Sequence, residues 1–138
     1  MKTIQEQEQE IVAEFSMYDD WMDKYAYLIE LGAAMEPMEE RRRVEANLIA
    51  GCQSRVWLHA EEREGRVYLQ ADSDALIPKG IVALLLRVFS GQPTDDILAA
   101  DLEFINTIGL SSHLAPTRAN GLLSMIKQVK LYALAYAK

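Results

Sequence analysis

Apolar residues recur at helical spacing in the first third of the chain. Thr3 and Glu6 have capping-box spacing, in which each side chain satisfies a backbone N–H of the other residue. This pair predicts the start of a first helix, whose apolar positions are Ile4, Ile11, Val12 and Phe15. The stretch "MEPMEERRR" (35–43) predicts a polar connector after the second helix, with Pro37 as its breaker.

That second helix is predicted to begin near Asp19 or Asp20, because a carboxylate is favoured at a helix N-terminus. Its apolar positions are Trp21, Tyr25, Leu28 and Ile29. We expect it to end at Gly32, in the left-handed conformation that glycine adopts readily.

Between residues 44 and 70 the pattern changes to alternation, which is typical of strands. Three short strands are predicted, over 44–49, 55–60 and 67–70, joined by turns at "GCQS" (51–54) and "EEREG" (61–65). The three would form an antiparallel meander, and its first bend would contain Cys52.

Helical spacing returns after residue 72. One helix is predicted to be capped by Ser73 or Asp74, to hold Pro78 in its first turn and to end at Gly91. Two shorter helices follow, the first capped by Thr94 and the second ending at Gly109. A long last helix has Pro116 near its start and one apolar face, made of Leu122, Met125, Ile126, Val129 and Ala133. The order of elements predicts an α+β fold, a single domain over 1–138 with several helices packed on one side of a small antiparallel sheet.

Composition excludes several classes of function. The formal net charge of −7 and the pI of about 4.8 argue against a nucleic-acid surface, which needs clustered Lys and Arg. The basic run 41–43 directly follows Glu39 and Glu40, so we expect a solvated loop of mixed charge. The apolar run 81–89 is about half the length that crosses a bilayer and contains Arg87, so it predicts a buried helix. The N-terminal stretch is acidic and rich in glutamine, which is unlike a signal peptide.

Cys52 is the single cysteine, so neither an intrachain disulfide nor a metal site built from several thiolates can form. A free thiol fits a reducing cytoplasm. One interpretation of Cys52 is a small buried hydrophobe, which is how most free cysteines behave. The other is an exposed nucleophile, because Gly51, Gln53 and Ser54 around it are turn residues. Candidates to favour its thiolate are Arg55, Arg118, His113 and the N-terminus of the last helix.

Three stretches carry a resemblance to a known family: "NLIAGCQSRVW" (47–57), "ADSDALIPKGIVALLLRVFSG" (71–91) and "LSSHLAPTRANGLLSMI" (110–126). They resemble the signature blocks of the SufE family, and the similarity runs from the "WMDKYAYLIELG" helix to the C-terminal helix. One departure is Ala71, where a glycine is expected before "DSDA".

The resemblance implies an α+β fold shared with iron–sulfur scaffold proteins and an active-site cysteine, here Cys52, on a loop between two strands. It implies that Cys52 accepts persulfide sulfur from a PLP-dependent, SufS-like cysteine desulfurase, stimulates that enzyme, and passes the sulfur on for iron–sulfur cluster assembly. The downstream partner would be a sulfur acceptor or cluster scaffold. The chain would act as a sulfurtransferase partner with no cofactor or metal of its own, because the PLP would belong to the desulfurase. We expect a resting thiol tucked under apolar neighbours until the partner draws it out.

Further residues have two interpretations each. Asp72 and Asp74 are paired acids or helix-start caps, and the resemblance implies that Asp74 holds the cysteine loop by hydrogen bonds. His113 is a general base or a structural hydrogen-bonding residue. Arg118, in the first turn of the last helix, opposes the helix dipole, which suggests an anionic partner such as the persulfide or an acidic loop residue.

Other functions are open to a chain with one thiol. A cysteine-dependent hydrolase or transferase would use Cys52, His113 and Asp74 as a triad, which requires the histidine within hydrogen-bond reach of the sulfur. An iron–sulfur scaffold usually needs several thiolates, and a peroxide sensor usually needs a resolving cysteine from another chain.

Overall fold

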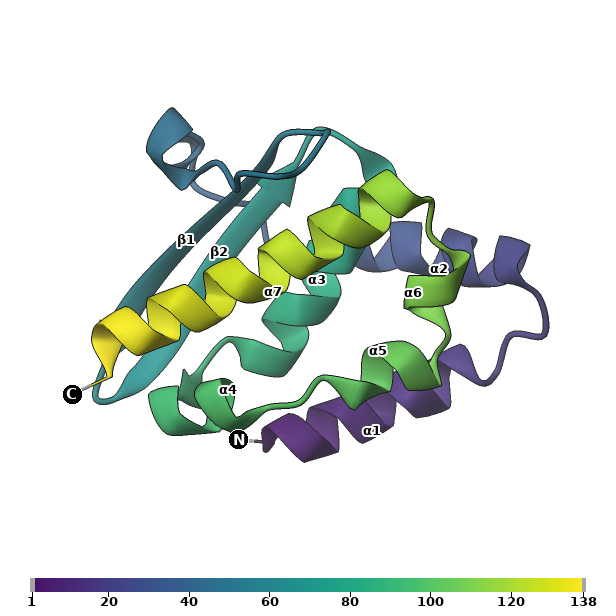
Figure 1. Ribbon diagram of the computed structural model, residues 1–138, viewed down its shortest axis with the longest axis horizontal. Helices are drawn as coiled ribbons and strands as arrows, with labels where there is room; N and C mark the ends of the chain where they lie inside the picture. The colour runs from purple at the N-terminus through teal and green to yellow at the C-terminus, as the bar shows by residue number, and fades with distance from the viewer. Residues whose placement is uncertain (1, 138) are drawn as a thin grey trace.

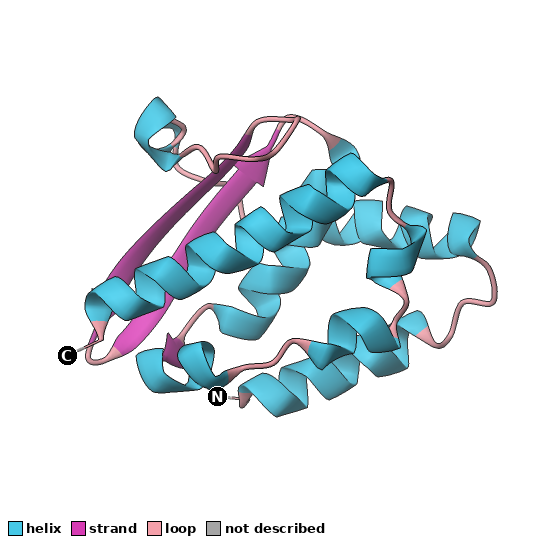
Figure 2. Ribbon diagram, in the orientation of Figure 1, coloured by secondary structure: helices cyan, strands magenta, loops and turns pink. Residues whose placement is uncertain are grey.

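The computed structural model describes residues 2–137, and in it helices cover one face of an antiparallel sheet (Figures 1 and 2). The strands are β1 (Val56–Arg63), β2 (Arg66–Ser73) and β3 (Gln92–Pro93), in the order β1-β2-β3. The helices are α1 (Ile4–Phe15), α2 (Trp21–Ala34), α3 (Leu76–Phe89), α4 (Thr94–Ala99), α5 (Glu103–Thr107), α6 (Leu110–His113) and α7 (Pro116–Tyr136), with short 3-10 helices η1 (Glu40–Arg42) and η2 (Glu45–Asn47). The predicted α+β class is confirmed.

Alternation along β1 and β2 directs one set of side chains toward the helices. On β1 the buried positions are Val56, Leu58 and Ala60, and on β2 they are Val67, Leu69, Ala71 and Ser73. The two strands are joined by Glu64 and Gly65, at φ 53° and 80°. Two successive positive φ values suit a tight hairpin, whose twist then matches that of the strands. Helices α3 and α7 pack against this buried face (Figure 1).

The predicted strand over 44–49 is wrong. The segment instead contains η2, and its pairing with β1 is reduced to one bridge, Leu48 with Trp57, and the Ile49 N–H donating to the Val56 carbonyl at 2.9 Å. The physical reason is that tyrosine hydroxyls of α7 bind the carbonyl groups of β1 with which a third strand would pair. Tyr132 donates to the Leu58 carbonyl at 3.2 Å and Tyr136 to the Ala60 carbonyl at 3.0 Å. The third strand of the sheet is the two-residue β3, which the alternation pattern did not indicate.

The run 41–43 is more ordered than the solvated loop expected from its sequence. Arg42 pairs with Glu61 at 2.7 Å and Arg43 with Asp72 at 2.7 Å, so both half-buried arginines hold this segment beside the strands. Only Arg41 of the three is exposed.

Most predicted helix ends are close to those observed. The Thr3–Glu6 capping box is formed, Asp20 caps α2, Pro78 lies in the first turn of α3, and Pro116 is the first residue of α7. Gly109, at φ 80°, ends the segment that contains α5. The short α6 after it was not predicted, and Thr94 is the first residue of α4 rather than its cap.

Gly32 does not end α2, which continues to Ala34. Its role lies in packing, because α2 and α3 cross with their backbones nearly in contact at Gly32 and Gly80. A Cβ on Gly80 would lie 2.3 Å from the Leu28 carbonyl oxygen, and one on Gly32 would lie 2.8 Å from the Gly80 nitrogen. Only glycine permits so close a crossing.

No helix among the described residues combines the length and apolar character needed to cross a membrane.

Candidate functional site

The cysteine loop, residues 50–54, connects the bridge at Leu48 with the start of β1 and lies against α7. Its conformation depends on Gly51, whose φ of 87° lies in the left-handed region. A Cβ at this position would lie 2.5 Å from Ser124 Oγ of α7, so the loop backbone packs directly on the helix. The contact places the next side chain, Cys52, against the same helix.

The Cys52 thiol is half-buried and donates a hydrogen bond to the Gly121 carbonyl of α7, with 3.7 Å between sulfur and oxygen. Burial raises the pKa of this thiol, because a thiolate is solvated less well there than in water. The resting side chain is therefore a protonated thiol. The raised pKa lowers the fraction of the reactive thiolate at neutral pH.

A cavity of about 70 Å³ lies beside the thiol. It is larger than the roughly 10–15 Å³ that one water molecule requires, so one additional atom fits next to the sulfur. Its walls come from the loop, β1, α3 and α7: Cys52, Gln53, Ser54, Val56, Pro78, Ile81, Thr117, Arg118, Gly121 and Met125. Val56, Pro78, Ile81 and Met125 of this lining are buried and apolar, whereas Gln53 and Arg118 are exposed.

Hydrogen bonds at Arg55 fix the end of the cysteine loop to Ser73 and Asp74, just before α3. Asp74 Oδ1 accepts from the Arg55 N–H at 3.1 Å, and the Asp74 N–H donates to the Arg55 carbonyl at 3.2 Å. The buried Ser73 hydroxyl donates to the same carbonyl at 2.7 Å. Neither side chain caps α3, whose N-cap is Ala75, so the predicted cap is wrong. The physical reason is that both side chains hydrogen-bond to Arg55.

Asp72 is not paired with Asp74. Its carboxylate contacts Arg43 Nε at 2.7 Å and Lys79 Nζ at 3.4 Å. Burial alone would raise the pKa of Asp72, but hydrogen bonds from Arg43 and the Ser73 N–H, together with the Lys79 charge, outweigh it and lower the pKa. Asp72 is therefore a charged structural residue that holds the connector beside the sheet.

His113 lies outside the cysteine site. Its ring stacks on Trp21 with 4.1 Å between centroids, and its Nδ1 lies 2.9 Å from the Gly109 carbonyl. The Tyr25 hydroxyl donates to the His113 carbonyl. None of the contacts that the structure describes joins His113 to Cys52 or Asp74, so the three do not form a triad at rest.

Arg118 reaches the rim of the cavity from the first turn of α7, and it is exposed. Among the described residues it forms no ion pair, so no acidic loop residue neutralises it. Its guanidinium is free to contact an anion at the mouth of the cavity.

Sequence reasoning missed the residues that enclose the thiol: Val56, Pro78, Ile81, Gly121 and Met125. Their apolar character is common to any core and gives no signal of its own. Gly121 is the exception, because a glycine inside a helical pattern costs helix stability and therefore stands out in the sequence.

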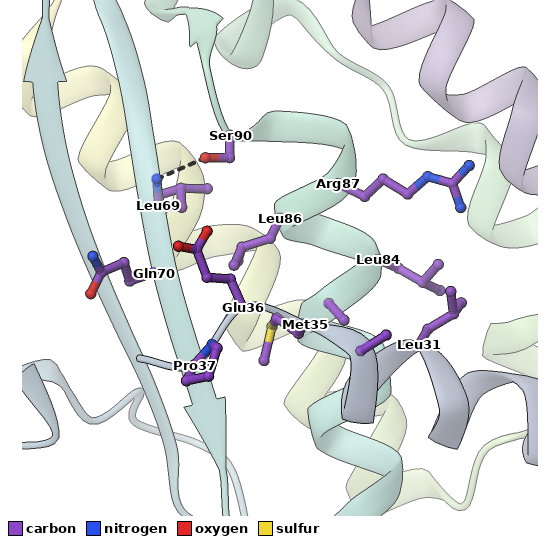
Figure 3. A pocket seen from close by; sticks show the side chains of 12 residues that line it. Leu31, Met35, Glu36, Pro37, Leu69, Gln70, Leu84, Leu86, Arg87 and Ser90 are labelled. Atoms are coloured by element: carbon purple, nitrogen blue, oxygen red, sulfur yellow. Dashed lines mark hydrogen bonds between the residues drawn. The ribbon is translucent and has the colours of Figure 1, made fainter. Parts of the chain in front are cut away.

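A larger hollow lies elsewhere, between the end of α2, strand β2 and α3 (Figure 3). Its volume is about 370 Å³, and Leu31, Met35 and Leu86 contribute apolar surface. Arg87 points away from it toward α1, where its Nη1 contacts Glu14 at 2.6 Å. The residues that line this hollow include no cysteine.

Comparisons with known proteins agree on one family. The model of the SufE family, described as an Fe-S metabolism associated domain, matches residues 9–133. SufE-like proteins of Rhizobium etli and Rhizobium meliloti are 39% and 40% identical over 88% of this chain, covering 85% and 90% of their own lengths. The solution structure of a hypothetical protein from Thermus thermophilus has the same fold, with a TM-score of 0.77 over 94% of this chain and 95% of that chain, at 20% identity. The chain therefore belongs to the SufE family, whose domain is associated with iron–sulfur metabolism.

Proposed function

We propose that this protein accepts sulfur on Cys52 from the persulfide of a PLP-dependent, SufS-like cysteine desulfurase and delivers it for iron–sulfur cluster assembly. The observation that carries the proposal is the half-buried Cys52 thiol beside a cavity with room for one more atom. Membership of a family associated with iron–sulfur metabolism supports it. The lone thiol fits a carrier, because a carrier needs one nucleophile and no resolving cysteine.

The transfer is a thiol–disulfide exchange that takes place between two proteins. The Cys52 thiolate attacks the outer sulfur of the desulfurase persulfide, and a new S–S bond forms on Cys52. The S–S bond of the desulfurase breaks, and its cysteine leaves as a thiolate. One sulfur atom moves: the desulfurase cysteine is reduced from persulfide to thiolate as Cys52 is oxidised from thiolate to persulfide. The two changes balance, so no external oxidant or reductant is required. A second exchange of the same kind hands the sulfur to the downstream acceptor or scaffold.

Ionisation of Cys52 would be favoured when the loop leaves α7, because burial opposes the thiolate. The hydrogen bonds to Val56 and Asp74 fix the loop only at its two ends. Between them, the described hydrogen bonds join residues 50–54 to another element only through the Cys52 thiol. Thiols are weak donors, so a docked desulfurase has little to break when it draws the loop out.

The neighbouring residues would support this cycle in different ways. Gly51 gives the loop its bend, Gln53 and Ser54 line the cavity, and Asp74 fixes the end of the loop. Arg118 would stabilise the negative charge of the terminal sulfur at the rim. His113, packed on Trp21, would hold the corner before α7 and take no part in the chemistry. The exchange needs reduced thiols, which fits a cytoplasmic location.

Desulfurase turnover tests the proposal. Alanine release from L-cysteine, with a dithiol present to reduce the persulfides to sulfide, is measured with a SufS-like desulfurase alone, with the wild-type protein, and with Cys52→Ser. We expect a several-fold stimulation by the wild-type protein, because it removes the enzyme's persulfide, and none by Cys52→Ser. Equal stimulation by the two proteins would show that sulfur transfer to Cys52 is not the cause.

A further inference from the structure

We infer that Gly121 is the residue that admits the second sulfur atom beside the docked Cys52, an inference that rests on the proposed function. The other six glycines have a structural reason in the resting protein. Four adopt a positive φ (Gly51, Gly65, Gly91 and Gly109), and two form the helix crossing (Gly32 and Gly80). Gly121 belongs to neither group.

Gly121 lies six residues into α7, where its backbone is helical and it is buried. Glycine is the poorest helix former after proline, so an alanine here would favour the helix. Alanine would also fit the resting structure. A Cβ on Gly121 would lie 3.6 Å from Cys52 Sγ, an ordinary contact, and would meet no other described atom within 4 Å outside its own helix. Neither backbone conformation nor space in the thiol form requires glycine.

The persulfide form of Cys52 supplies a reason for glycine at position 121. A persulfide places a second sulfur about 2.05 Å from Sγ. Because Sγ already lies at contact distance from the position of a Cβ on residue 121, a sulfur added on the α7 side would overlap that Cβ. When residue 121 has no Cβ, the space on the α7 side of Sγ continues into the cavity between Gly121, Met125 and Val56. The missing side chain thus gives the terminal sulfur a place among buried apolar groups, shielded from small nucleophiles.

Forming the Cys52 persulfide chemically, without a desulfurase, tests this inference independently of the proposed partner. Inorganic polysulfide is the sulfur donor: the Cys52 thiolate attacks it, an S–S bond forms on Cys52, and a polysulfide one sulfur shorter leaves. Mass spectrometry verifies the addition of one sulfur atom. Cyanide then removes that sulfur as thiocyanate and returns the thiolate, and its rate reports how far the persulfide is exposed.

Gly121→Ala is expected to act in opposite directions on the two forms. The melting temperature of the thiol form should rise by about 3–5 °C, because the helix gains a better residue. The persulfide form should lose that gain and should release thiocyanate at least five-fold faster than the loaded wild-type protein. Asn120→Ala, an exposed replacement one residue away, is the matched control: it should raise both melting temperatures alike and leave the cyanide rate unchanged.

Three results distinguish the claims. A Gly121→Ala persulfide that reacts with cyanide at the wild-type rate, with equal melting gains in both forms, would overturn the role of Gly121. A wild-type chain that takes up no sulfur from polysulfide would overturn it as well. A wild-type chain that loads from polysulfide but never from a desulfurase would refute the proposed function and leave the role of Gly121 standing.

Discussion

At the scale of single residues, burial lowers the reactivity of the Cys52 thiol. Its sulfur rests against Gly121 of α7, and the loss of solvation there raises the pKa of the thiol. Within the described part of the chain, no hydrogen bond or ion pair favours the thiolate, and burial is the cause of the raised pKa. An exposed reactive cysteine has the opposite properties. At neutral pH the Cys52 thiol of the resting protein is accordingly a poor nucleophile.

The rate of Cys52 alkylation as a function of pH tests this balance. Its midpoint in the folded protein should lie above that of the same thiol in urea, which titrates near pH 8.5 or so. Stability should follow the same sign: the folded state keeps its proton longer, so the free energy of unfolding falls as the pH rises past the unfolded pKa. In Cys52→Ser, this pH dependence of the free energy of unfolding should be absent. A midpoint at or below the unfolded value would contradict the account.

At the scale of elements, the attachment of the cysteine loop depends on the start of α3. Asp74 and the loop end share two hydrogen bonds at Arg55, one of them through the Asp74 carboxylate. The loop has no comparable bond in its middle among the described contacts. Its opening should thus be governed by these end contacts together with the thiol's bond to α7.

Asp74→Ala tests this dependence. Removing the carboxylate leaves the Arg55 N–H without its acceptor and should destabilise the docked loop by about 1 kcal/mol. If alkylation proceeds mainly through the open loop, Cys52 should then react about five-fold faster at neutral pH. Asp19→Ala, which removes an exposed acid with no described hydrogen bond, is the control and should react at the wild-type rate. Unchanged alkylation of Asp74→Ala would mean that this contact does not hold the loop.

The elements also show which parts of the fold could be predicted from the sequence. Local signals sufficed for α1, whose capping box formed as predicted, and for α7, whose buried face matches the predicted stripe except that Ile126 is half-buried. The segment 44–49 was mispredicted because its place along β1 is decided by Tyr132 and Tyr136, far away in the sequence. Gly32 was misread as a helix end for a similar reason, since its neighbour Gly80 lies on another helix.

At the scale of the whole molecule, the site exists because four elements converge. The loop supplies Cys52, β1 supplies Val56, α3 supplies Pro78 and Ile81, and α7 supplies Gly121. The sequence singled out the thiol through its turn chemistry, but the cavity depends on contacts between segments up to 69 residues apart, such as Cys52 and Gly121. His113 was a plausible partner from sequence, yet the fold places it on Trp21.

The most direct measurement is the intact mass of the protein after incubation with a SufS-like desulfurase and L-cysteine. The account predicts that the wild-type chain gains the mass of one sulfur atom, that a reductant removes it, and that Cys52→Ser gains nothing. An unchanged wild-type mass beside a desulfurase that is turning over cysteine, or an equal gain by Cys52→Ser, would contradict it.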